Sequence, residues 1–329
     1  MKIGYLGAGS WGMALSNLLA RKGYFVTHWD RNKEKIRELK ETRRHKRLKS
    51  LEIPENIVFT GDLDEAVKDK DLIVESVTSQ GIREVLSNIK NLKCPIVITS
   101  KGIEKDSGFL FPEVLLDIFG EENNKFIGCL TGPSHAEEVV KNLPTTVVSS
   151  SYDFSTMNLI AKTFYTPSFR VYPNTDIIGV SFGGAIKNII AIACGISDGL
   201  GFGDNAKAAI MTRGLHEMKK LASIKNANAE TLNGLSGMGD LCVTCMSALS
   251  RNYKFGILFA KGYCLEDAKK EIGMAVEGVY AAVSALQIAR KFDIPIPITE
   301  AVNAVLYDKL DPRNVVKLLM QRTIKDELK

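Results

Sequence analysis

The residue with the clearest chemical potential is a lysine in an apolar stretch, Gly183–Ile189 (GGAIKNI). The periodicity around Lys187 predicts a helix over residues 185–196. A buried ammonium costs several kcal/mol unless it is paired, and burial commonly lowers its pKa. Lys187 therefore fits a general acid or base near neutral pH. A lysine that extends its ammonium to the surface fits the helix pattern equally well.

Small residues and two strand ends favour the functional interpretation. Gly183 and Gly184 fall on or near the helix face of Lys187, where they would let a ligand approach the ammonium. Thr99–Gly102 and Gly132–Ser134 each follow a predicted strand, at the edge of an open α/β sheet where ligands bind.

Two segments in the second half of the chain add an acid and an anion site. Leu235–Leu241 contains the glycine-flanked Asp240, with Thr244 close behind. Ser250–Asn252 supplies a cation and two hydrogen-bonding side chains that suit a phosphate. Lys101 and Lys187, an acid to orient one of them and an anion site fit an enzyme that acts on a small phosphorylated alcohol; with the dinucleotide motif described next, they indicate a nicotinamide enzyme.

The first motif of the chain predicts a dinucleotide site. Gly7–Gly12 (GAGSWG) is a full GxGxxG placed directly after a strand-like run and before a helix-like run. In this context the first glycine allows a tight turn, the second lets the backbone approach a pyrophosphate, and the third packs the helix on the strand. The N-terminus of the following helix would favour the phosphate charges.

The sequence leaves the choice between NAD and NADP open. Asp30 ends the second predicted strand, where an acid would bind the ribose hydroxyls of NAD, but the adjacent Arg31 would suit the 2′-phosphate of NADP. The basic run at residues 43–49 follows closely. A solvated, mobile loop is the preferred interpretation of this run; attraction of a phosphorylated cofactor and a nucleic-acid or localisation patch are the alternatives.

The pattern of elements predicts two domains. Residues 1–178 should form a Rossmann domain with a mostly parallel sheet, because short β-branched runs alternate with helix-like stretches. The predicted strands are Lys2–Leu6, Phe25–Trp29, Leu72–Val77, Ile96–Thr99, Phe126–Leu130 and Thr145–Ser149, and a helix is predicted over Trp11–Arg21. Residues 179–329 should form an all-helical domain, with helices at 185–196, 206–223, 277–291, 299–309 and 312–320.

Composition bounds the class of protein. The 329 residues carry a net charge of +5, which is too weak to argue for nucleic acid. The start of the chain lacks a signal-peptide pattern, and the sequence has no long uninterrupted apolar run, so we expect a cytoplasmic protein without a membrane span. Six scattered cysteines suit free thiols, the Cys242–Cys245 CxxC has no second ligand pair nearby, and the histidines lack metal-ligand spacing. We therefore expect no metal.

At this point the motifs resemble one family closely, the NAD(P)-dependent sn-glycerol-3-phosphate dehydrogenases of bacterial type. The resemblance spans almost the whole chain, with the motifs in the expected order. It is carried by GAGSWGMAL at 7–15, SKGIE at 100–104, GPSHAEEV at 132–139, the stretch 183–214, LSGMGDLCVTCMSALSRN at 235–252 and VEG at 276–278. It implies an N-terminal Rossmann domain, a C-terminal helical domain and an active site in the cleft between them.

The resemblance also implies residue roles. Lys187 would exchange the proton of the C2 hydroxyl, Asp240 would position Lys187, and Lys101 would stabilise the developing alkoxide; Thr244 is a further polar member of the site. The implied substrate contacts are Lys101, Gly132, Ser134, Lys187, Asp240, Ser250, Arg251 and Asn252. The implied cofactor contacts are the first-motif glycines Gly7, Gly9 and Gly12, together with Ser10, Trp11, Arg31, Lys101, Ala136, Arg251 and Glu277.

The remaining implications concern reaction, partners and alternatives. The chain would interconvert sn-glycerol 3-phosphate and dihydroxyacetone phosphate with NAD or NADP, supply phospholipid synthesis, and bind neither nucleic acid nor membrane; a homodimer is an open expectation. Departures from the family are Val77–Gln80, where a proline is usual, and the basic run in place of a Tyr-Leu-Pro-Gly stretch. Hydroxyacyl-CoA or sugar-nucleotide dehydrogenases and a dinucleotide sensor without catalysis are the competing interpretations.

Overall fold

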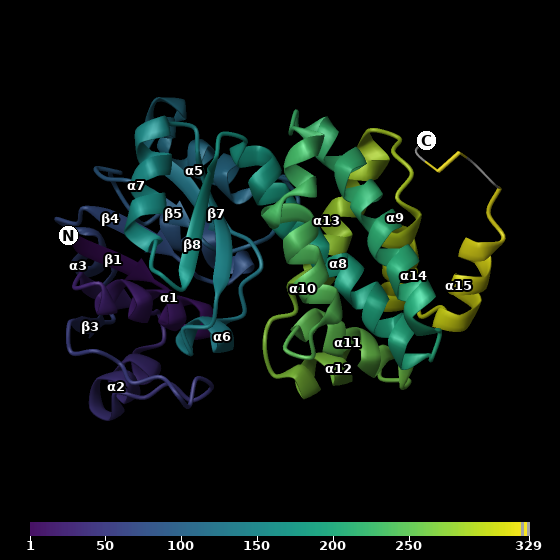
Figure 1. The fold of residues 1–329 in the computed structure, drawn as a ribbon, viewed down its shortest axis with the longest axis horizontal. Coiled ribbons are helices and arrows are strands. Elements are labelled where there is room, and N and C mark those ends of the chain that lie inside the picture. The colour runs from purple at the N-terminus through teal and green to yellow at the C-terminus, as the bar shows by residue number, and fades with distance from the viewer. Residues whose placement is uncertain (324–325, 328–329) are drawn as a thin grey trace.

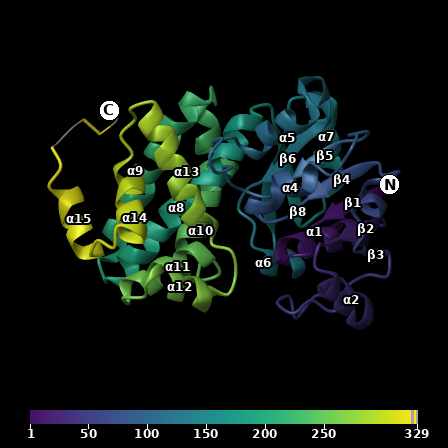
Figure 2. The same cartoon turned by 180° about the vertical axis from the view of Figure 1, so that it is seen from behind.

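The fold has a sheet-containing N-terminal half and a helical C-terminal half, which lie side by side (Figures 1 and 2). The computed structural model describes residues 1–323, 326 and 327. Within these residues one eight-stranded sheet has the order β3-β2-β1-β4-β5-β6-β7-β8, and only β6 and β7 pair antiparallel. The predicted fold class, a mostly parallel Rossmann-type sheet followed by helices, is confirmed.

The strand bounds follow the hydrophobic runs. The strands are β1 (Lys2–Leu6), β2 (Phe25–Trp29), β3 (Ile57–Thr60), β4 (Leu72–Glu75), β5 (Ile96–Ile98), β6 (Ile127–Thr131), β7 (Thr145–Ser151) and β8 (Phe169–Asn174). Central strands such as β4 and β5 are buried along their whole length, as expected where helices cover both faces of a parallel sheet. The one acidic residue in these runs, Glu75, is buried with them.

The two strands that the sequence pattern missed, β3 and β8, lie at the two edges of the sheet. β3 is only four residues long, and Val58 within it is 55% exposed. β8 contains Pro173, which lacks a backbone donor and is tolerated at a sheet edge, and most of its side chains are at least partly exposed. Edge strands carry a weak burial pattern, which explains why both were missed.

The helices divide between the two halves. In the N-terminal half they are α1 (Ser10–Arg21), α2 (Lys33–Thr42), α3 (Leu63–Val67), α4 (Ile82–Leu86), α5 (Phe111–Phe119), α6 (Ala136–Val140) and α7 (Phe154–Phe164). In the C-terminal half they are α8 (Ile177–Gly199), α9 (Gly203–Ile224), α10 (Asp240–Met246), α11 (Arg251–Ala260), α12 (Leu265–Ile272), α13 (Glu277–Lys291), α14 (Pro297–Tyr307) and α15 (Pro312–Met320).

Helix α8 is the core of the helical half. By length and hydropathy it is the one helix in the described residues that could cross a bilayer, but 83% of its most apolar window is buried inside the fold. The neighbouring α11 approaches it closely, because both helices carry glycine at the crossing. A Cβ on Gly195 would lie 2.0 Å from the Tyr253 carbonyl oxygen, and one on Gly256 would lie 2.2 Å from that of Ile192.

The sheet edge that carries the strand ends faces the helical half. Side chains that follow β4 and β5 bond to residues of that half: Ser79 to Glu277, and Lys101 to Asp240. The boundary between residues 178 and 179 stays a prediction, and it falls in the first turn of α8. Residues 324, 325, 328 and 329 of the second predicted domain lie outside the described part of the chain.

The contact between α8 and α11 gives a prediction about stability. Gly256→Ala should lower the free energy of unfolding by about 1–3 kcal/mol, because the added methyl group overlaps the α8 backbone, which cannot rotate away. Denaturant unfolding would measure this change. Gly61→Ala is the control: its Cβ would meet only the flexible Lys33 side chain at 3.4 Å. Equal stability of the two variants would contradict the close crossing.

Candidate active site

Lys187 lies in the middle of α8, and its side chain is only 8% exposed. Its Nζ donates to Oδ1 of Asp240 and, at 2.7 Å, to Oγ1 of Thr244. Thr244 Oγ1 in turn donates to the Asp240 backbone carbonyl at 2.6 Å. The ammonium is therefore held inside the protein by a carboxylate and a hydroxyl and does not extend to the surface, which excludes the alternative left open by the helix pattern.

Asp240 is brought to Lys187 by a short π-helical turn, Leu235–Gly239, which leads directly into α10. Glycines allow this turn to pack closely on two sides, against α8 and against the preceding 3-10 helix Ala229–Asn233. A Cβ on Gly183 would lie 2.4 Å from the Ser236 carbonyl oxygen, and one on Gly237 would lie 2.1 Å from that of Leu232. Gly183 thus allows the helix to approach the turn, which is a different role from the ligand clearance expected from the sequence.

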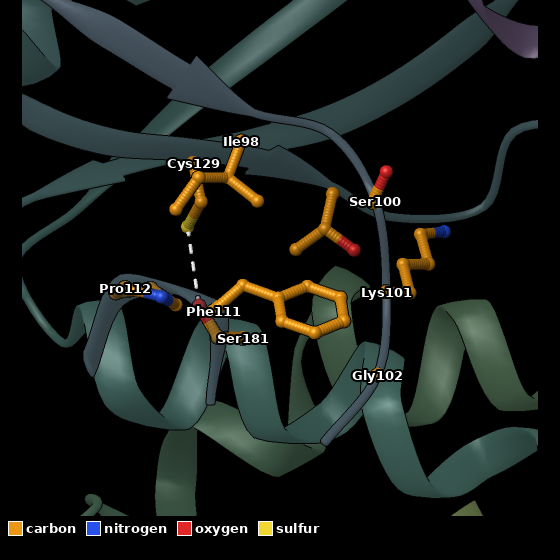
Figure 3. Close-up of a pocket in the computed structure, with 9 residues that line it drawn as sticks. Ile98, Ser100, Lys101, Gly102, Phe111, Pro112, Cys129 and Ser181 are labelled. Atoms are coloured by element: carbon orange, nitrogen blue, oxygen red, sulfur yellow. Dashed lines mark hydrogen bonds between the residues drawn. The ribbon is translucent and has the colours of Figure 1, made fainter. Parts of the chain in front are cut away.

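Lys101 reaches the same carboxylate from the other half of the molecule. Its Nζ donates to Oδ2 of Asp240 at 2.6 Å and to the Gly132 carbonyl at 3.1 Å. Figure 3 shows Lys101 on the segment that leaves β5, extending away from the Phe111 ring. A Cβ on Gly184 would lie 3.2 Å from Cδ and Cγ of Lys101, so this second glycine makes room for the lysine stem against α8.

The electrostatics of this cluster suit proton transfer. Burial lowers the pKa of Lys187 to about 8; the Asp240 carboxylate opposes that change and the Lys101 ammonium adds to it. Near neutral pH both forms of Lys187 are therefore accessible. Two ammonium groups share one carboxylate, which leaves one uncompensated positive charge and favours an oxygen that becomes negative during a reaction.

The glycine-rich turn has the geometry of a pyrophosphate cradle. Gly7 adopts a φ of +102°, which favours glycine, and a Cβ on Gly12 would lie 2.1 Å from the Gly7 carbonyl oxygen. A Cβ on Gly9 would instead stand in open space, on the side that faces a cavity. Ser10 and Trp11 line the same cavity at the start of α1. The turn therefore fits a dinucleotide.

Asp30 and Arg31 have different surroundings. Asp30 Oδ2 accepts from the Ala8 backbone at 2.9 Å and from Lys35 Nζ at 2.6 Å, so this carboxylate ties the end of β2 to the glycine-rich turn. Arg31 is largely exposed, lies 3.7 Å from Glu84, and is not among the residues that line the cavity. Its role in cofactor binding stays a prediction.

One cavity of about 880 Å³ joins the lysine cluster to the glycine-rich turn. Its size and polar lining are those of a ligand site. The predicted site residues that line it are Gly9, Ser10, Trp11, Gly12, Lys101, Ser134, Ala136, Lys187, Thr244, Ser250, Arg251, Asn252 and Glu277. Three further predicted residues are not part of the lining but support it. Gly7 shapes the glycine-rich turn, and Gly132 and Asp240 accept hydrogen bonds from Lys101.

The N-terminus of α11 forms part of the cavity wall. The Ser250 hydroxyl caps the helix by accepting from the Tyr253 backbone, and the first-turn amides have no helical acceptors. Arg251 donates to the Ala275 carbonyl at 2.8 Å. Asn252 is held by Asn188 and by the Gly278 backbone, so its side chain also ties α11 to α8 and α13.

Several lining residues were not identified from sequence. Asn188 and His135 line the cavity, and the buried His135 Nε2 has no hydrogen-bond partner in the described residues. Lys35 also lines it, although nothing in its local sequence marked it, and so does Arg47 of the basic run at 43–49. Only a helical-wheel argument could have found Asn188, as the residue after Lys187.

The basic run at 43–49 is mostly exposed to solvent, as predicted, but two of its arginines have partners elsewhere in the fold. Arg43 donates to the Ile57 carbonyl at 2.9 Å and lies over the Phe59 ring at 5.5 Å. Arg47 donates to the Gly273 carbonyl at 3.0 Å, which joins the run to the helical half. The wall of the cavity therefore includes part of this run.

Within residues 1–323, 326 and 327, no group of three or more His, Cys, Asp or Glu side chains is placed to hold an ion. All six cysteines are free. Cys242 contacts Met238, and Cys245 is buried in the core of the helical half. The CxxC therefore packs inside the fold.

Comparisons with known proteins agree over the whole chain. Two family models match it, the NAD-dependent glycerol-3-phosphate dehydrogenase N-terminus over residues 2–157 and C-terminus over residues 176–317. Proteins from Protochlamydia amoebophila and Chlamydia caviae, both named glycerol-3-phosphate dehydrogenase (NAD(P)+), are 54% and 53% identical over 329 residues, which is 99% of this chain and 99% and 98% of theirs. The crystal structure of glycerol-3-phosphate dehydrogenase from Coxiella burnetii superposes with a TM-score of 0.91 at 37% identity, covering 98% of this chain and 99% of that one.

The shared carboxylate gives a prediction about the lysine cluster. Asp240→Asn should lower the pKa of Lys187 from about 8 by roughly 1 to 3 units, because it removes the anion that opposes burial and the Lys101 charge. NMR titration of the lysine side chains would measure it. Thr244→Val, which keeps the carboxylate, should change the pKa much less. An unaltered pKa in Asp240→Asn would exclude this account of the site.

Proposed function

The chain belongs to the family of NAD-dependent glycerol-3-phosphate dehydrogenases, and we propose that it interconverts sn-glycerol 3-phosphate and dihydroxyacetone phosphate by hydride transfer with NAD(H) or NADP(H). The observation that carries this proposal is the pair of lysines on one buried carboxylate, in the same cavity as the glycine-rich turn. A proton-transfer group and a dinucleotide cradle in one cavity are what this reaction requires.

The glycine-rich turn and the start of α1 would hold the cofactor pyrophosphate, through backbone amides at the helix N-terminus. Trp11, Ala136 and Glu277 line the same space and would contact the rest of the cofactor. When bound, the nicotinamide supplies the hydride to C2 of the ketone or takes it from C2 of the alcohol.

Lys187 would move the proton. In the reduction its ammonium gives a proton to the oxygen on C2, and in the oxidation its neutral amine takes that proton away. Asp240 and Thr244 orient the amine, and a pKa of about 8 makes both directions accessible near neutral pH. The Lys101 ammonium, which shares the Asp240 carboxylate, would stabilise the negative charge that develops on this oxygen.

The α11 N-terminus would bind the phosphate. Arg251 and Asn252 line the cavity, and their backbone amides in the first turn of α11 have no helical acceptor. Binding a remote phosphate supplies energy for orienting C2 against the nicotinamide. Ser134 and Gly132, beside Lys101, would complete the substrate contacts.

Further parts of the proposal concern the cell. Glycerol 3-phosphate is the backbone of glycerophospholipids, so we propose supply of phospholipid synthesis as the role. Free cysteines throughout the chain support a reducing compartment such as the cytoplasm. A homodimer remains a proposal for solution measurement.

Substitution of the lysine tests the proton-transfer role. Lys187→Ala should lower kcat by roughly 10²- to 10⁴-fold, because it removes the proton donor that Asp240 and Thr244 orient, while NADH binding persists. Turnover can be followed by NADH absorbance and binding by NADH fluorescence. Near-normal turnover of this variant would refute the assignment of Lys187.

Removal of the substrate phosphate tests the substrate class. NADH and NADPH oxidation should be followed side by side with dihydroxyacetone phosphate and with dihydroxyacetone. The unphosphorylated ketone should have a kcat/KM lower by roughly 10²-fold or more, because it cannot use the α11 N-terminus. Arg251→Ala should bring the kcat/KM values of the two ketones closer together. Equal kcat/KM values for the two ketones would show that the α11 N-terminus does not bind the substrate phosphate.

A further inference from the structure

Glu75 is a buried acid that the mechanism above does not use. It ends β4, at the sheet edge between the cofactor-facing loop and the segment that carries Lys101, and it has no exposed surface. Its Oε1 accepts from the Val77 backbone at 2.6 Å and bonds to the Ser100 hydroxyl at 2.8 Å. Its Oε2 is buried with no hydrogen-bond partner, and no ion pair of Glu75 occurs within the described residues.

The protons in this network can be counted. Ser100 has one hydroxyl proton but two oxygens within reach, Oε1 of Glu75 at 2.8 Å and the Val77 carbonyl at 2.6 Å. If Glu75 is a neutral acid, it donates to Ser100 Oγ, Ser100 donates to the Val77 carbonyl, and the Val77 amide donates to Glu75. The acid O–H then has an acceptor in Ser100 Oγ, and the unpartnered Oε2 is a neutral carbonyl oxygen, which costs far less to bury without a partner than a carboxylate oxygen does.

The surroundings support the neutral form. Burial raises the pKa of Glu75 to about 7, against the opposing hydrogen bonds from the Ser100 hydroxyl and from the Val77, Ser100 and Thr99 backbones. The titratable groups around it are the Tyr5 phenol on β1, whose pKa the Glu75 charge helps to raise, and Lys101, which follows Ser100. Tyr5 bonds to Ser76, which bonds to Thr99, and Thr99 donates to the Glu75 carbonyl. These side chains all connect the ends of neighbouring strands.

We propose that Glu75 is a positioning residue for the hydride transfer: as a neutral carboxylic acid it fixes the segment that carries Lys101 to the loop Ser76–Ser79. That loop lines the cofactor side of the cavity, and Ser79 continues the connection to Glu277 across the cleft. Figure 3 shows the Ser100 hydroxyl pointing away from the Phe111 ring. This inference rests on the proposed function, because it assigns Glu75 to the same reaction.

The experiment compares wild type with Glu75→Gln and Glu75→Ala from pH 6 to pH 9. Glutamine is the neutral isostere, so it should keep most of the wild-type kcat at pH 6. Wild type should bind NADH more weakly as the pH rises through about 7, where Glu75 ionises, and Glu75→Gln should lack this change. Glu75→Ala should lower kcat on the order of tenfold at every pH, because the segment that carries Lys101 is no longer fixed to the loop Ser76–Ser79.

The control is Glu217, a second buried glutamate whose pKa burial raises to about 7. It caps the start of α14 by accepting from the Ile298 and Thr299 backbone, in the core of the helical half. Glu217→Gln should alter stability but leave the pH dependence of NADH binding as in wild type.

Two outcomes would overturn the proposal: a Glu75→Gln variant with the wild-type pH dependence of NADH binding, or a Glu75→Ala variant with the wild-type kcat. If Glu75→Ala does not fold, the binding titration of Glu75→Gln decides alone. Because NADH binding needs no turnover, this titration judges Glu75 even if wild type fails to reduce dihydroxyacetone phosphate, and that failure would count against the proposed function only.

Discussion

The arrangement of the whole site depends on one buried carboxylate that two lysines share. Asp240 is almost completely buried, and each of its oxygens accepts from a different ammonium, Lys101 from the sheet half and Lys187 from the helical half. A carboxylate in this position would be costly without both partners, and each ammonium would be costly without it. The contact therefore joins the two halves of the molecule at the point where the chemistry takes place.

Close backbone packing makes this contact geometrically available. Gly183 admits the turn that ends at Asp240, and Gly184 admits the stem of Lys101. At the other end of α8, Gly195 lets α11 approach, which brings the capped N-terminus of that helix to the cavity. Side chains at these positions would separate the groups by the width of a methyl or more, and a hydrogen bond between charges does not tolerate that separation.

The sheet edge supplies the second set of constraints. Polar side chains there hold one strand end to the next: Asp30 binds the glycine-rich turn, Glu75 binds Ser100, and Ser79 reaches Glu277 on the helical side. Inside the protein such bonds are strong and their loss is expensive, so they keep loops in place that would otherwise be mobile. The cofactor cradle and Lys101 are thereby held in a fixed relation to each other.

The sequence by itself determined the elements with strong periodicity and the residues with a distinct local motif. β1, β2, α13 and α15 have the predicted bounds, and the GxGxxG and Lys187 stand where local pattern placed them. Only the tertiary structure decided which groups meet. It placed Gly183 against the backbone of the turn before Asp240 and Gly184 against the Lys101 stem. It also joined Asp30 to Lys35, Arg47 to Gly273 and Glu75 to Ser100. Hydrophobic periodicity and turn chemistry are local properties of the chain, so they can be recognised in the sequence. These contacts depend on how the folded chain brings side chains together, and no local pattern encodes that.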